Sequence, residues 1–218
     1  MKRRSAIALF TAVLALSSCS KERINGNGAV TTETRNVSGF TAILSGGSTE
    51  VFVTQGSTFK VEVKGYSNLL PYYETELVNN TLRLGYRSGV NVKNDNTQVY
   101  ITMPVLNDVN IAGSGNFKAF GNFSGNNSFK LNTSGSGNIH IEGGSAQNFY
   151  SNIAGSGNIY ALGIVADNVE TVTSGSGDTE VTANNQLKVV INGSGSVYYL
   201  GNPTITANIT GSGAVMHK

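Results

Sequence analysis

The segment Thr133-Ser134-Gly135-Ser136-Gly137-Asn138-Ile139-His140-Ile141 contains the pattern that decides the fold. Its central Gly-Ser-Gly tripeptide occurs six times, at intervals of 22, 20, 20, 18 and 18 residues. A repeat of nearly constant spacing is typical of a solenoid, whose units bury their apolar faces by stacking on one another. The glycines of the six tripeptides are Gly113 and Gly115, Gly135 and Gly137, Gly155 and Gly157, Gly175 and Gly177, Gly193 and Gly195, and Gly211 and Gly213.

Apolar and polar residues alternate on both sides of each tripeptide, as in strands with one buried face. The second residue before it is Ile111, Thr133, Ile153, Thr173, Ile191 or Ile209, and the second residue after it is Phe117, Ile139, Ile159, Thr179, Val197 or Val215. One strand therefore leads into each turn and another leaves it. We interpret the glycines as structural, because glycine reaches positive φ and lets stacked backbones approach closely.

Two further positions after the tripeptide form columns when the repeats are aligned. The first residue after it is Asn116, Asn138, Asn158, Asp178, Ser196 or Ala214, a partial ladder able to hydrogen-bond along a stack. The third residue after it is Lys118, His140, Tyr160, Glu180, Tyr198 or Met216, which alternation places toward solvent. Aromatic and charged side chains on a rigid sheet form a candidate binding surface for glycan or protein. The alternative is that these are ordinary solvent-facing strand residues, favoured by β-propensity.

Composition and the N-terminus indicate an extracytoplasmic protein. Only 13% of the 218 residues are charged, Trp is absent, and Gly is abundant, which suits an all-β chain rich in turns. The first residues combine three basic side chains, an apolar run from Ala6 to Leu16, and Ser17-Ser18-Cys19. This is the pattern of a secretory signal. Leu16-Ser17-Ser18-Cys19 resembles the lipobox of bacterial lipoproteins, which implies lipidation of Cys19, the sole cysteine, and attachment to a membrane through that lipid.

Removal of the first 18 residues leaves 12 basic and 13 acidic residues, a net charge of −1. With no basic excess, nucleic acid is not an expected partner. Ser20, where an Asp would signal retention, resembles the signals that send lipoproteins to the outer membrane, on a side that the sequence leaves open. We predict a signal peptide over residues 1–18, a tether over 19–28, and a single β-solenoid domain over 29–218.

The motifs together resemble the putative auto-transporter adhesin head GIN domain family, whose function is unknown. The resemblance rests on the lipoprotein signal, the Pro-Val-Leu-x-x-Val motif at Pro104 to Val109, and the serial Gly-Ser-Gly-Asn turns. It covers residues 37–214, departs where Asp178, Ser196 and Ala214 replace the turn Asn, and supplies no catalytic residues. It implies a right-handed β-helix-like fold and a role at the cell surface or in the envelope.

Three functions compete at this stage. The first is an adhesin-like interaction module without enzyme activity, cofactor or metal. The second is a structural envelope lipoprotein whose uncapped terminal coil, next to Lys218, invites association of chains. The third, an enzyme, would need carboxylates from the non-repeating insert at residues 66–96, where Glu74, Glu76 and Asp95 occur. A single Asp178 among six turns does not make a calcium-binding repeat.

Overall fold

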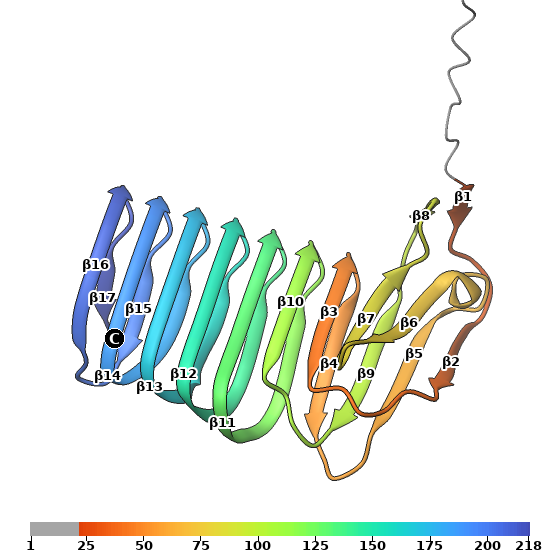
Figure 1. Ribbon diagram of the computed structural model, residues 1–218. Coiled ribbons are helices and arrows are strands. Elements are labelled where there is room, and N and C mark those ends of the chain that lie inside the picture. The colour runs from red at the N-terminus through yellow and green to blue at the C-terminus, as the bar shows by residue number, and fades with distance from the viewer. Residues whose placement is uncertain (1–21) are drawn as a thin grey trace, which may run out of the picture.

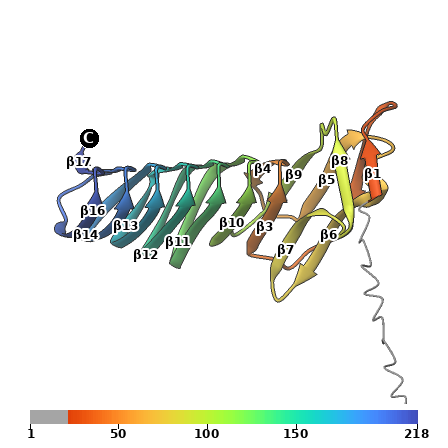
Figure 2. The ribbon, with the colours of Figure 1, turned by 90° about the horizontal axis from the view of Figure 1, so that it is seen from above.

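The computed structural model describes residues 22–218, which form a long stack of β-strands, closed at one end by a less regular region (Figures 1 and 2). The predicted signal peptide and Cys19 lie outside the described residues. Within them the only helical element is the single 3₁₀ turn η1 (Leu70–Tyr72). The expected all-β solenoid is confirmed.

Each coil consists of a strand that leads into a turn and a strand that leaves it. The leading strands stack into one sheet and the trailing strands into another, here called the leading sheet and the trailing sheet. The long strands bend, so that their first part lies in the trailing sheet and their last part in the leading sheet of the next coil. The strands are β10 (Asp108–Gly113), β11 (Phe117–Gly135), β12 (Ile139–Gly155), β13 (Ile159–Gly175), β14 (Thr179–Gly193), β15 (Val197–Leu200), β16 (Thr204–Gly211) and β17 (Val215–His217).

A further coil precedes the six that carry the tripeptide. It consists of β3 (Ala42–Gly47) and β4 (Glu50–Gln55), which pair in parallel with β10 and β11. Gly47 lies opposite Gly113, and Val51 lies opposite Phe117. The segment from Phe40 to Val53 is therefore a degenerate copy of the strand-turn-strand repeat.

The N-terminal region caps the stack, largely with antiparallel strands. β9 (Gln98–Met103) pairs with β4, then with β5 (Lys60–Tyr66), which pairs with β2 (Val30–Arg35). On the other sheet, β7 (Thr81–Tyr86) pairs with β3 and forms a hairpin with β6 (Tyr73–Val78). β1 (Glu22–Asn25) pairs with β8 (Val90–Lys93). The described fold thus begins inside the segment that we expected to be a tether.

The space between the two sheets is filled by one continuous apolar core. Columns of equivalent residues stack along it, and the rings of Phe129 and Phe149 lie with centroids 6.4 Å apart. The core extends into the cap through Phe40, Leu70 and Tyr73. It ends abruptly at β16, where Ile205 and Ile209 are each 40% exposed. Among residues 22–218, the stack is therefore capped at its N-terminal end, whereas β16 is exposed at the other end.

Both glycines of a tripeptide are needed, for different reasons. Gly135 has φ +126°, and a Cβ there would lie 2.3 Å from the carbonyl oxygen of Gly113 in the preceding coil. Gly137 has no positive φ, but its Cβ would lie 2.2 Å from the Gly115 oxygen. The tight stacking is held by backbone hydrogen bonds, since the Ser136 amide donates to the Gly113 oxygen at 2.9 Å. At both glycine positions, the stacked turns leave no room for a Cβ atom.

The residue after each turn forms the expected ladder. The Asn138 Oδ1 accepts hydrogen bonds from the Asn158 backbone amide at 2.9 Å and from its Nδ2 at 3.1 Å. Asn116 serves Asn138 in the same way. Asp178 continues the ladder, because its Oδ1 accepts from the Ser196 amide at 2.7 Å. The ability of Asn to adopt positive φ is not used here; the described non-glycine residues with positive φ are Asn79, Asn80 and Asn94, all in the cap.

Candidate functional site

The candidate binding residues predicted from the sequence lie together on the outer face of the trailing sheet. Parallel pairing places Lys118 beside His140, His140 beside Tyr160, and so on through Glu180 and Tyr198 to Met216. The rings of His140 and Tyr160 are 6.3 Å apart and tilted by 47°. All six side chains are exposed or half-buried. The sequence thus located one continuous row of side chains.

The row continues into the cap, which the sequence analysis missed. Lys118 pairs with Phe52, and Phe52 pairs with Tyr100. The rings of Phe52 and Tyr100 stack at 5.2 Å with an interplanar angle of 17°, and the Lys118 Nζ lies 5.9 Å from the Phe52 ring centroid. We call the full row the aromatic column: Tyr100, Phe52, Lys118, His140, Tyr160, Glu180, Tyr198 and Met216.

Phe52 could have been found from sequence, whereas Tyr100 could not. Phe52 occupies the same position after the turn of the first coil as Lys118 does after the next. Aligning the degenerate copy would have added it to the row. Tyr100 belongs to β9, a cap strand outside the repeat, and only the β4–β9 register places it beside Phe52.

A groove of about 310 Å³ lies at the middle of the aromatic column. Lys118, His140 and Tyr160 of the aromatic column line it, together with the ladder residues Asn116 and Asn138. The groove therefore combines ring faces with amide groups. Neighbouring strands are spaced by about 4.8 Å, and the groove is lined by residues of three neighbouring coils.

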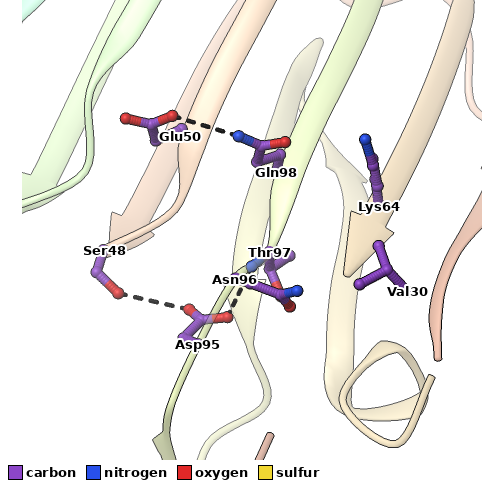
Figure 3. A pocket seen from close by; sticks show the side chains of 8 residues that line it. All are labelled: Val30, Ser48, Glu50, Lys64, Asp95, Asn96, Thr97 and Gln98. Carbon is purple, nitrogen blue, oxygen red and sulfur yellow. Dashed lines mark hydrogen bonds between the residues drawn. The ribbon is translucent and has the colours of Figure 1, made fainter. Parts of the chain in front are cut away.

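A second cavity, of about 440 Å³, lies at the cap end of the same face (Figure 3). Glu50 and Gln98 line it, each two residues before Phe52 or Tyr100 in its strand and therefore facing the same side. The Gln98 Nε2 donates to the Glu50 Oε2 at 3.5 Å. We call this cavity the polar pocket; its other lining residues are Val30, Ser48, Lys64, Asp95, Asn96 and Thr97.

Asp95 is held in place in the polar pocket by three donors. Its Oδ1 accepts from the Tyr86 hydroxyl at 2.7 Å and from the Thr97 amide at 2.9 Å, and its Oδ2 accepts from the Ser48 hydroxyl at 3.4 Å. Burial raises the pKa of Tyr86 well above its usual range, with the neighbouring Asp95 adding to the shift. The Tyr86 phenol therefore stays protonated and acts as a donor. These three hydrogen bonds fix the orientation of the Asp95 carboxylate.

The carboxylates of the insert do not gather at one site. Glu74 and Glu76 line a different cavity on β6 and β7, together with Arg83, while Asp95 lies in the polar pocket. Within residues 22–218 no group of three or more His, Cys, Asp and Glu side chains could hold a metal ion. On the leading sheet, the Lys188 Nζ lies 2.8 Å from the Glu170 Oε1, an ion pair between equivalent positions of neighbouring coils.

The fold defines a class, the β-solenoids that are capped at one end of the stack. Residues 39–203 match the family model described as "Putative auto-transporter adhesin, head GIN domain", and the chain belongs to this family. The resemblance inferred from the turns and the signal is confirmed. A search of the curated proteins finds no match.

Solved structures share the fold. A putative adhesin from Bacteroides fragilis NCTC 9343 is 23% identical, with a TM-score of 0.75 over 89% of this chain and 100% of that one. A putative adhesin from Parabacteroides merdae ATCC 43184 is 21% identical, with a TM-score of 0.57 over 90% and 99%. A putative lipid binding protein from Parabacteroides distasonis ATCC 8503 is 24% identical, with a TM-score of 0.60 over 90% and 100%. The family places the chain at the cell surface or in the envelope, and no described helix is long and apolar enough to cross a membrane.

Proposed function

We propose that this protein is a lipid-anchored, non-enzymatic interaction module of the outer membrane, and that it binds an extended glycan through the aromatic column. The observation that carries the proposal is the continuity of that column. Tyr100, Phe52, Tyr160 and Tyr198 present rings on one face of a rigid sheet, separated by whole coil steps. Rings fixed in this way bind the apolar faces of sugars at little cost in conformational entropy.

The polar groups beside the column suit a glycan better than an apolar protein surface. The Asn ladder runs parallel to the aromatic column, and both line the central groove. At the cap end, the polar pocket adds two carboxylates, two amides and Lys64, which together accept from and donate to sugar hydroxyls. A chain lying across the strands would meet rings on one side and hydrogen-bonding groups on the other. A protein ligand is the alternative occupant of this face.

The binding test compares tyrosines on the two sheets. Tyr160→Ala combined with Tyr198→Ala should weaken binding to the glycans selected on a glycan array by at least about tenfold. The reason is that stacking of a sugar on one aromatic ring contributes on the order of 1 kcal/mol. Tyr150→Ala is the matched control, since Tyr150 is 41% exposed but lies on the leading sheet. Equal binding by all three proteins, or equal loss in the control, would contradict the proposal.

The anchor is tested separately. Cys19→Ala removes the thiol that would carry the lipid, so the protein should leave the membrane fraction and stop incorporating labelled fatty acid. Protease treatment of intact cells, compared with cells whose outer membrane has been opened, then assigns the side. Cleavage on intact cells supports adhesion at the surface. Protection until opening would direct the search to partners in the periplasm.

A further inference from the structure

The C-terminal end of the stack exposes a complete strand edge. Every residue of β16 is exposed, and its leading-sheet neighbour on the inner side is β14 (Figure 1). Ile205, Ala207 and Ile209 belong to columns that are buried in the preceding coils, where Leu187, Val189 and Ile191 are at most 1% exposed. The last coil therefore presents the unfinished core and unpaired backbone groups together. Terminal coils of solenoids are normally covered.

The sequence of this strand is almost symmetric about Ala207. Residues 204–210 read Thr-Ile-Thr-Ala-Asn-Ile-Thr, so that Ile205 mirrors Ile209 and Thr204 mirrors Thr210. In an antiparallel pair of two such strands centred on Ala207, isoleucine lies opposite isoleucine and threonine opposite threonine. All the inward residues of one strand then meet inward residues of the other. A two-fold interface requires this self-complementarity.

The two ends of the stack also differ in the charged residues of their outer strands. β16 has no charged residue, so two copies can approach without like-charge repulsion. The outer strands of the cap are different, because β6 carries Glu74 and Glu76 and β2 carries Glu33 and Arg35. Charged side chains on an edge strand oppose pairing with another chain. One end is protected against association, and the other is not.

We propose that the protein forms a two-fold dimer in which β16 of one copy pairs antiparallel with β16 of a second copy, centred on Ala207. The two leading sheets then form one sheet, and the exposed isoleucines complete a shared core. Because the cap covers the opposite end of the stack in residues 22–218, the contact closes at two copies and does not propagate into fibres. Rotation about an axis normal to the sheets keeps both aromatic columns on the same side, which would make the dimer bivalent.

Cysteine crosslinking tests the register. In the otherwise cysteine-free Cys19→Ser protein, Ala207→Cys should form disulfide-linked dimers, because opposed Cα atoms in an antiparallel pair lie about 5 Å apart, within disulfide range. Ile205→Cys should not, since the two cysteines would be four residues out of register, about 14 Å apart. Crosslinking of both variants alike, or of Ile205→Cys alone, would overturn the proposed register.

Sedimentation equilibrium of the Cys19→Ser protein tests the association itself. The protein should be a dimer, and Thr206→Lys with Asn208→Lys should raise its dissociation constant about tenfold by placing ammonium groups opposite one another. Asn132→Lys with Ser134→Lys is the control, with the same charge on an outward face in the middle of the stack. Both pairs point outward, so circular dichroism should show unchanged folding. A monomer at every concentration would overturn the proposal.

Discussion

The repeated coils and the N-terminal cap share one core but are held together in opposite ways. From β10 onward, each strand pairs in parallel with its equivalent in the next coil, and the same four devices recur: glycine turns, an amide ladder, inward apolar columns and outward rows. In the cap, three strand pairs are antiparallel, β1 and β8 pair in parallel, and no fixed spacing in the sequence relates the partners. Residues of the same type therefore have different structural roles in the repeated coils and in the cap. Substitutions can test this directly.

Glycine should show the largest difference. Gly155 has φ +135°, and a Cβ there would lie 2.3 Å from the Gly135 oxygen, so Gly155→Ala should lower the free energy of unfolding by about 4 kcal/mol or more. Gly39 before the first coil also has positive φ, +81°, but open space around it, so Gly39→Ala should cost only about 1 kcal/mol. Urea unfolding followed by circular dichroism measures both. Similar losses would mean that turn stacking is not the constraint.

Asparagine should come next. Asn138→Gly removes an acceptor used twice and a donor, and should cost about 2 kcal/mol. Asn80 instead adopts φ +62° in the two-residue hairpin turn between β6 and β7, where an Asn-Gly pair is preferred. Asn80→Gly should therefore leave the melting temperature unchanged or raise it slightly. A loss at Asn80 equal to that at Asn138 would refute the distinction between side-chain and backbone roles.

Two threonines of one inward column should respond with opposite signs. Thr133 Oγ1 donates to the Gly137 oxygen at 2.8 Å, whereas the buried Thr173 Oγ1 has no hydrogen-bond partner. Thr173→Val should raise the free energy of unfolding by about 1 kcal/mol, and Thr133→Val should lower it by a similar amount. Calorimetry of the two variants gives the sign. A stabilised Thr133→Val protein would show that the turn does not depend on this hydroxyl.

The smallest effect is expected at the surface ion pairs. Lys188 and Glu170 are brought together by coil stacking, whereas Lys60 and Glu62 lie two residues apart in one strand of the cap. Both pairs are substantially exposed, so Lys188→Ala and Lys60→Ala should each cost about 0.5 kcal/mol or less. The small cost should vanish in high salt. A loss above about 1 kcal/mol at Lys188 would indicate that the coil-to-coil row contributes beyond a solvated pair.

The regular half could be predicted from the sequence because its register is written in the repeat. Alignment of the repeats on their first glycine predicts the row from Lys118 to Met216, and the parallel register places Lys118 beside His140 as expected. The first coil follows the same register, with Gly47 opposite Gly113. Each such pairing needs only that the next coil behave like the last.

The cap could not be predicted in the same way, because no period connects its strands. The alternation in Val61-Glu62-Val63 predicts a strand, but nothing local says that β5 lies between β2 and β9. For this reason the sequence did not reveal Tyr100 or the polar pocket as parts of this face. The expected tether, residues 19–28, also overlaps β1. The lipid on Cys19 and the ligand of the aromatic column remain predictions from the sequence.

The coils differ from one another at the edge of the stack opposite the glycine turns. Registers slip there, between Ala119 and Asn122 and between Ala161 and Val165, while the strands beside the turns stay aligned. The cap segment between β4 and β10, which contains β5 to β9, also leaves the first coil at this edge. The glycine turns thus form a regular edge of the stack, whereas the coils differ in length at the opposite edge. New loops, tags or epitopes should be grafted at the open edge, near Gly125, where the neighbouring backbone leaves room.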